Sequence, residues 1–142
     1  EEFLEKTLHV LSSLSHQVSL IFIAEEEKVQ VEGSTNILDQ PEFQSIETAR
    51  PVLNVLERRK AIQKLLREDL SSQGAKVRIG SEAHDPSFRE CSLISAPYFH
   101  GSKGMGVLGI LGPRRMNYGQ MISLVSCAAE RMGESLERRF ER

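Results

Sequence analysis

The chain has 142 residues, of which 39% are hydrophobic and 27% charged, and its formal net charge is -2. This length suits one globular domain with a real core, since a domain of about 150 residues buries roughly 70% of its unfolded surface. Acidic and basic residues are interspersed, so no global field favours nucleic acid or an anionic membrane, and no apolar stretch approaches the roughly 20 residues of a membrane span.

The first half of the chain reads as a helix, two strands and a longer helical segment. Apolar residues recur at three- and four-residue steps over 3–14, which predicts an amphipathic helix whose apolar stripe ends at Leu14. The runs 18–24 and 28–32 are typical of strands. A helical period follows from Phe43 onward. Pro51 is expected to interrupt it and to begin a second helix that ends at Gly74.

The second half changes character and is predicted to complete a sheet. Residues 75–80, 91–99 and 104–111 read as strands separated by polar loops. After them, Asn117 can cap a long last helix with one apolar stripe from Met121 to Phe140. Hairpin-length connections favour an antiparallel sheet with packed helices, so the predicted fold class is α+β rather than alternating βαβ units.

One short motif invites a different interpretation. GMGVLG, formed by residues 104–109, matches the Gly-x-Gly-x-x-Gly pattern of a dinucleotide-binding turn. That turn needs a strand before it and a helix opening on it. Here the glycines stand inside an apolar run that ends at Gly112-Pro113. We therefore interpret the motif as part of a core strand and expect no cofactor.

Candidate catalytic and metal-binding residues do not assemble into a site. His9 and His16 could share a helix face, but zinc needs three or four ligands and no other His or Cys has a compatible spacing. His84-Asp85, Ser87 and Cys91 include nucleophile and base types, yet nothing places a base beside a nucleophile. We expect no catalytic residue and no metal site, and hence no enzyme.

Charged clusters are interpreted as solvated surface. Glu25-Glu26-Glu27 lacks the alternating ligands of a calcium loop and is predicted to be an exposed turn. The basic clusters 58–60 and 138–139 lie on predicted helices, where salt bridges with nearby glutamates are common. No helix-turn-helix pattern accompanies them.

The two cysteines, Cys91 and Cys127, stand far apart without CxxC spacing. Both lie in apolar runs, so we expect two packed, reduced thiols. Together with the acidic start, which does not resemble a signal peptide, this predicts a cytoplasmic protein.

The stretch GVLGILGPRRMNYGQMISLV, residues 106–125, resembles the C-terminal signature of the bacterial heat-inducible transcription repressor HrcA. KVQVEGSTNILDQPEF also resembles a segment of that family, with Asp39 standing where the family has asparagine, and LSSLSHQVSLIF resembles the start of the same region. The resemblance spans nearly the whole chain. The signature residues, which we expect to have a structural role, are Gly109, Gly112, Pro113, Arg115, Met116, Asn117 and Tyr118.

The resemblance implies that residues 1–142 form a GAF-like regulatory domain of a repressor. It also implies, for the complete protein, control of chaperone operons through an inverted-repeat operator and dependence on the GroEL chaperonin. We expect the complete protein to be a homodimer, the commonest closed assembly. A small-ligand-sensing GAF-like module with another output is the alternative.

Two departures from the family pattern accompany the resemblance. The family's winged-helix domain, through which operator DNA would be bound, is expected upstream and has no counterpart in these residues. A long family segment that includes an inserted dimerising domain also has no counterpart, and the junction is expected near residues 22–28.

Overall fold

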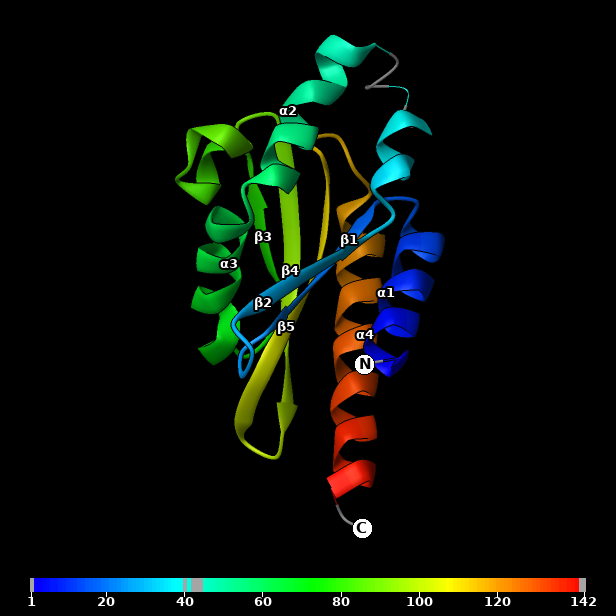
Figure 1. Cartoon of the computed structure of the whole chain (residues 1–142), viewed down its shortest axis with the longest axis vertical. Coiled ribbons are helices and arrows are strands. Elements are labelled where there is room, and N and C mark those ends of the chain that lie inside the picture. The colour runs from blue at the N-terminus through cyan, green and yellow to red at the C-terminus, as the bar shows by residue number, and fades with distance from the viewer. Residues whose placement is uncertain (1, 40, 42–44, 141–142) are drawn as a thin grey trace.

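An antiparallel sheet lies between two layers of helices in the computed structural model, which describes residues 2–39, 41 and 45–140 (Figure 1). Its strand order is β2-β1-β5-β4-β3. The strands are β1 (Val18–Ile23), β2 (Lys28–Glu32), β3 (Lys76–Ile79), β4 (Cys91–His100) and β5 (Lys103–Pro113).

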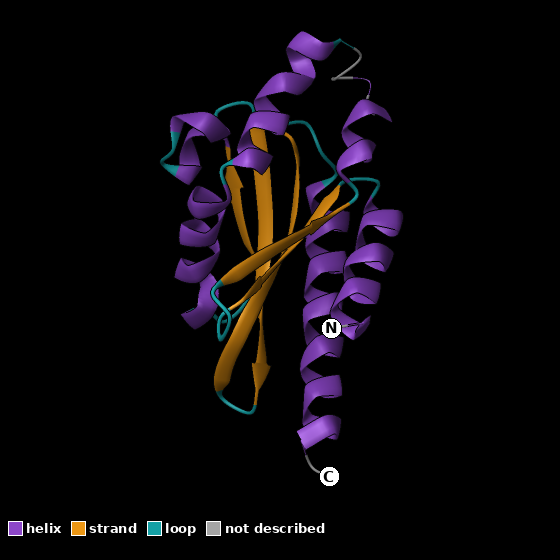
Figure 2. Cartoon of the chain, viewed as in Figure 1, coloured by secondary structure: helices purple, strands orange, loops and turns teal. Residues whose placement is uncertain are grey.

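Helices α1 (Glu2–Ser15) and α4 (Tyr118–Phe140) cover one face of the sheet, and α2 (Ile46–Glu57) and α3 (Arg59–Glu68) cover the other (Figure 2). Short 3-10 turns connect these elements: η1 (Ser34–Asp39), η3 (Asp69–Ser71), η4 (Gly80–Ala83) and η5 (Pro86–Phe88). The expected α+β arrangement, an antiparallel sheet with packed helices, is confirmed.

Alternation along the strands creates a separate core on each face. In β1, Leu20 and Phe22 point into the core under α2 and α3, while Ile21 and Ile23 point into the core under α1 and α4. All four are buried. Side chains of successive strand residues point to opposite faces, so a continuous apolar run such as VSLIFI is what a strand covered on both sides requires.

The strand pair at the expected junction is directly connected. Ile23 pairs with Lys28, and the intervening residues form a tight turn in which Glu27 donates its backbone N–H to Ala24. Glu25, Glu26 and Glu27 are exposed, as expected of a turn. The main chain thus passes from β1 into its partner β2 within one hairpin.

The prediction for Pro51 is wrong. Helix α2 runs through Pro51, and the helical chain is interrupted at Arg58, where the backbone leaves helical geometry (φ -95, ψ 64). Pro51 lies near the start of α2, so its missing N–H removes a single bond, to the carbonyl four residues earlier. The buried side chains of Val52 and Val55 hold the helix on the sheet despite that loss. Phe43, which opened the predicted helical period, lies outside the described residues.

The glycine motif lies in β5, as expected. Gly106 pairs with Ile23 of β1 and with Tyr98 of β4. A Cβ at this position would stand 2.1 Å from the Phe22 carbonyl oxygen, a distance that no side chain tolerates. The glycine therefore allows close approach within the sheet, and the next α-helix, α4, begins only at Tyr118.

Candidate functional site at the corner and grooves of the last helix

The signature residues gather where β5 turns into α4. Gly112 pairs with Ser92 at the end of the β4 and β5 ladder. A Cβ on Gly112 would lie 2.5 Å from Gln17 Oε1 and 2.7 Å from Met116 Cε, so a larger residue here would have to displace the ends of these two side chains. The corner is therefore packed directly against Gln17, in the link between α1 and β1.

Tyr118 ties the start of α4 back to the sheet. Its hydroxyl donates to the backbone carbonyl of Arg114 and lies 2.6 Å from Ser92 Oγ, which can donate to it in turn. The first residue of the helix is thus bonded both to the preceding loop and to β4. These two contacts restrict the angle at which α4 leaves the sheet.

Asn117 caps α4, as the sequence predicts. Its side-chain Oδ1 accepts the backbone N–H of Gln120 at 3.2 Å, and its carbonyl accepts the N–H of Met121 at 3.0 Å. An asparagine cap of this kind stabilises a helix by about 1 kcal/mol relative to alanine. Arg115 is exposed beside it. The corner therefore has a structural geometry, and its functional importance stays a prediction.

A second feature is an open groove on the outer side of the helical layer formed by α1 and α4. We call it the outer groove; it has a volume of about 580 Å³. Val10 and Leu14 of α1 are 53% and 57% exposed along it. The lining residues are Phe3, Lys6, Thr7, Val10, Leu11, Leu14, Leu124, Cys127, Ala128, Arg131, Met132, Glu134, Ser135 and Arg138.

Two predictions fail in the outer groove. Leu14 was expected in the buried stripe of the first helix, but it faces outward because the sheet takes the neighbouring direction, where Leu8 and Leu11 are buried. Cys127 was expected to be packed, but it is exposed on the outer side of α4. A hydrogen bond with Cys127 is the main cause that raises the pKa of the Arg131 guanidinium, and Glu134 adds to it.

A buried ionic cluster joins α3 and η3 to the sheet on the opposite face. Arg78 donates two hydrogen bonds to the carboxylate of Asp69, at 2.8 and 2.9 Å, and a third to the Leu65 carbonyl. Ser95 of β4 donates to the same carboxylate. Asp69 is fully buried and Arg78 is 4% exposed. Such a buried charge pair is tolerated because each partner makes three hydrogen bonds.

Sequence reasoning missed this cluster, since Asp69 and Arg78 look like ordinary surface charges in a polar stretch. The signal that was available is weak: Arg78 occupies the alternate position between Val77 and Ile79 in a short strand. Only the pairing of β3 with β4 brings Arg78 under α3 and next to Ser95.

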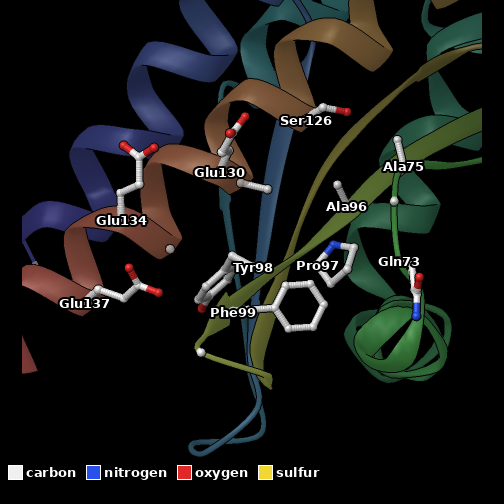
Figure 3. A pocket seen from close by; sticks show the side chains of 14 residues that line it. Gln73, Ala75, Ala96, Pro97, Tyr98, Phe99, Ser126, Glu130, Glu134 and Glu137 are labelled. Atoms are coloured by element: carbon white, nitrogen blue, oxygen red, sulfur yellow. The ribbon is translucent and has the colours of Figure 1, made fainter.

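A further groove lies at the free edge of β4 (Figure 3). Strand β3 pairs with β4 only from Ser92 to Ser95, and the groove of about 430 Å³ begins just beyond, at Ala96. Figure 3 shows the rings of Tyr98 and Phe99 between Glu130, Glu134 and Glu137 of α4 on one side and Gln73 and Ala75 on the other. Pro97 has no backbone N–H to offer, which protects this edge against addition of another strand.

The remaining candidate residues stay apart. His9 lies beside Glu32, 3.7 Å from its carboxylate, and within the described residues no group of three or more His, Cys, Asp or Glu side chains could hold a metal ion. His16 directly follows α1 and has a left-handed backbone conformation, with φ 58. In the part of the chain that is described, no helix is both long and apolar enough to cross a membrane.

The loop that contained possible nucleophiles has a structural role. Asp85 caps η5: it accepts the Ser87 hydroxyl and backbone N–H, and the hydroxyl contributes most to lowering the pKa of the Asp85 carboxyl. Cys91 is buried in the core, and that burial raises the pKa of its thiol to about 12. Such a thiol is protonated at neutral pH and is a poor nucleophile.

The basic clusters are surface features where they are described. Residues 58–60 are exposed, and Arg59 reaches the Val29 carbonyl of β2 at 3.4 Å. Arg138 is exposed at the end of α4, while the side chain of Arg139 lies outside the described part of the chain.

Comparison with known proteins identifies relatives of most of the chain. The family described as "HrcA protein C terminal domain" matches residues 20–122. The heat-inducible transcription repressor HrcA of Pelotomaculum thermopropionicum is 36% identical over 129 residues, which cover 91% of this chain and 35% of that protein. HrcA of Brevibacillus brevis is 36% identical over 118 residues, covering 83% of this chain and 34% of that protein. The chain spans about a third of the length of these curated relatives.

Solved structures agree on the fold. A protein described as hypothetical has a TM-score of 0.75 at 15% identity, with 94% of this chain and 70% of that chain covered. A domain of an IclR-family transcriptional regulator has a TM-score of 0.53 at 12% identity, with 93% of both chains covered. These neighbours confirm the expected GAF-like α+β class.

Proposed function

Because this chain belongs to the HrcA family of heat-inducible transcription repressors, we propose that it holds two DNA-binding domains of such a repressor at the spacing of an inverted-repeat operator. The family is one of regulators and not of enzymes. The observation that carries the proposal is the pair α1 and α4, which lie antiparallel on one face of the sheet (Figure 1) and leave an apolar groove outside. Helix α4 is fixed to the sheet at the signature corner.

The mechanism follows from how α1 is held. Ser19 of β1 donates to the carbonyl of Leu8 in α1 at 2.7 Å, and Asn36 donates to the carbonyls of Ser12 and Gln17. A domain attached ahead of α1 would therefore be oriented by the folded sheet. When heat unfolds the sheet, that orientation is lost and with it the match to two half-sites on the DNA.

The chain itself is proposed not to recognise operator sequence. Sequence readout needs an element that enters a groove and side chains that reach base edges, whereas scattered Lys and Arg contact phosphates only. We assign readout to an upstream winged helix, the class that the family resemblance implies. We propose that the operators are those of chaperone genes. The protein would then act in the cytoplasm, where its DNA lies.

The family resemblance also supports a role for the GroEL chaperonin in keeping the repressor folded and active. The exposed apolar side chains of the outer groove, Val10 and Leu14, are the kind of surface that marks an interaction site. Occupation of the chaperonin by heat-damaged proteins would then release the operons.

The family's longer inserted segment would leave the domain at the hairpin between β1 and β2. This hairpin lies at the edge of the sheet, with β2 as the outermost strand, so additional chain could depart there without crossing the core. We propose that the domain folds without such a segment.

An operator titration at physiological salt tests the function. Two proteins are compared: this chain alone, and this chain joined at its N-terminus to a winged-helix domain of the kind that the family resemblance implies. We expect sequence-selective binding by the joined protein and only weak, salt-sensitive binding by the chain alone. Selective binding by the chain alone would refute the division of roles, and absence of selective binding by the joined protein would refute the repressor assignment.

A further inference from the structure

Helix α3 carries a strong local concentration of positive charge. Residues 58–67 hold five of the chain's 18 Lys and Arg and no Asp or Glu, although the formal net charge of the whole chain is -2. All five basic residues are exposed, while the other side of the helix is buried on the sheet. We call the exposed surface the basic face; it consists of Arg58, Arg59, Lys60, Lys64 and Arg67.

The positive charges at the start of α3 do not stabilise the helix that carries them. Arg58 stands at the N-cap position without a side-chain cap, and Arg59 and Lys60 follow in the first turn, which has no acidic residue. The dipole of a helix favours negative side chains at this end and disfavours positive ones. A local conflict of this kind between sequence and stability is typical of a surface that has a function.

Most of the basic face has no carboxylate partner. Within the part of the chain that the structure describes, Arg67 alone among its residues makes an ion pair, with Glu27 at 2.6 Å. Arg59 donates to the neutral carbonyl of Val29 at 3.4 Å, so its charge is not compensated. Four positive charges are therefore available to an anionic partner: Arg58, Arg59, Lys60 and Lys64.

Acidic groups border the basic face without neutralising it. Glu57 is exposed immediately before it. Ser87 is the main cause that lowers the pKa of the Asp85 carboxyl, and the positive charges of Arg58 and Lys64 add to it. The Asp85 carboxylate is already bonded to the hydroxyl and the backbone N–H of Ser87. A row of cations thus outnumbers the two carboxylates beside it.

The fold holds the basic face in a fixed position. Arg78 of β3 donates to the Leu65 carbonyl of α3, and its other partners, Asp69 and Glu68, lie at the end of the same helix. Helix α3 lies on the opposite side of the sheet from α1 and α4 (Figure 2), so a partner bound here leaves the outer groove free. A rigid row of charges suits a partner whose own charges are regularly spaced.

We propose that the basic face binds the phosphate backbone of duplex DNA. From residue 58 to residue 67 a helix rises about 14 Å. Phosphates on one strand of B-DNA follow one another at about 3.4 Å along the axis, so roughly four of them span the same length. The proposal rests on the proposed function, which brings DNA to this protein. It adds a contact that positions the domain on DNA without reading sequence.

Salt-dependent DNA binding by matched variants of this chain tests the surface. The test variant is Arg59→Gln with Lys60→Gln and Lys64→Gln. The control removes three exposed positive charges from α1 and α4 instead: Lys6→Gln with Arg131→Gln and Arg138→Gln. The two variants have the same net charge, so a difference between them reports the position of the charges. The probe is a fluorescent duplex of about 30 base pairs with arbitrary sequence, titrated between about 20 and 200 mM NaCl.

The slope of affinity against salt counts the phosphate contacts. The logarithm of the binding constant falls with the logarithm of the salt concentration by about 0.9 for each contact, so we expect a slope of about -3 to -4 for the native chain and the control. The test variant should have a slope of about -1 and bind at least about tenfold more weakly at the lowest salt. Absence of binding by the native chain at the lowest salt would overturn the proposal, as would equal losses in the two variants.

A smaller change and a second polyanion sharpen the test. Lys60→Gln with Lys64→Gln leaves the contact between Arg59 and β2 in place and should reduce the slope by about 2. Both variants of the basic face should melt no lower than the native chain, and a much lower melting temperature would assign these charges to the fold and overturn the proposal. Poly-glutamate should bind more weakly than DNA. Tighter binding of poly-glutamate through the basic face would assign it to an acidic protein and also overturn the proposal.

Failure of this inference is separable from failure of the proposed function. If the joined protein selects its operator but the basic-face variant keeps the native salt slope, the repressor role stands and the basic face has no part in it. If the variant loses the slope but the joined protein selects no operator, the basic face stands and the repressor role fails.

Discussion

The helices on the two faces of the sheet are attached by different physics. Under α2 and α3, the buried carboxylate of Asp69 is bonded to Arg78 of β3 and to Ser95 of β4, so a polar latch crosses from the helical layer to two strands. On the other face, α1 and α4 pack on the sheet mainly through aliphatic side chains and leave the outer groove uncovered.

The two faces of a small domain can thus serve different purposes, one for stability and the other for contact with a partner. Buried ionic groups demand one arrangement, since any displacement leaves an unpaired charge in the core. Apolar helix packing tolerates adjustment more readily. The face with the latch is therefore suited to hold the fold, and the face with the groove is suited to meet a partner.

The largest effect is expected from breaking the latch. Asp69→Ala removes the carboxylate that holds the buried Arg78 guanidinium through two hydrogen bonds and leaves only the half-exposed Glu68 carboxylate, 3.6 Å away. The free energy of unfolding should fall by about 3–5 kcal/mol. Urea denaturation followed by circular dichroism measures the loss. The paired change Asp69→Leu with Arg78→Met removes both charges and should recover much of it. If Asp69→Ala costs no more than an exposed substitution, the latch does not distinguish the two faces.

A pair of leucine truncations compares the faces directly. Leu66 of α3 is fully buried, so Leu66→Ala should cost about 2–5 kcal/mol. Leu14 of α1 is 57% exposed, and Leu14→Ala should change the stability of the monomer by less than about 0.5 kcal/mol. Both are measured by urea denaturation at the same low protein concentration. Equal costs would mean that Leu14 is packed in solution.

The effect that is smallest at neutral pH is a pH dependence that belongs to the latched face. Burial raises the pKa of the Cys91 thiol from about 9.0 to about 12, so the unfolded chain loses this proton first as the pH rises. Stability from this group is fully present below pH 9 and is lost between about pH 9 and 12, by up to about 1.4 kcal/mol per pH unit.

Denaturation series over this range on Cys91→Ala and Cys127→Ser separate the two thiols. The alkaline decline should be shallower in Cys91→Ala than in the native chain, and unchanged in Cys127→Ser. An identical slope in the native chain and in Cys91→Ala would show that the Cys91 thiol is not protected by the core.

Much of the architecture could be predicted from the sequence, because the signals that specify it come from neighbouring residues. The apolar run of β1, the glycine strand β5 and the Asn117 cap each depend on neighbouring residues, and the structure has all three where the sequence predicts them. Pro51 shows the limit of such reasoning. A proline favours a helix start, but the buried residues that follow it hold α2 together as one helix.

The fold class, the order of the elements and the family could be predicted from the sequence, because periodicity, turn residues and the Gly112 to Tyr118 corner are local signals. The tertiary structure alone decided which sides of α1 and α4 face outward, and so which residues form the outer groove. It also decided that Asp69 meets Arg78 in the core. The physical reason is the same in both cases: burial and pairing depend on residues that are distant in sequence, and no local pattern records them.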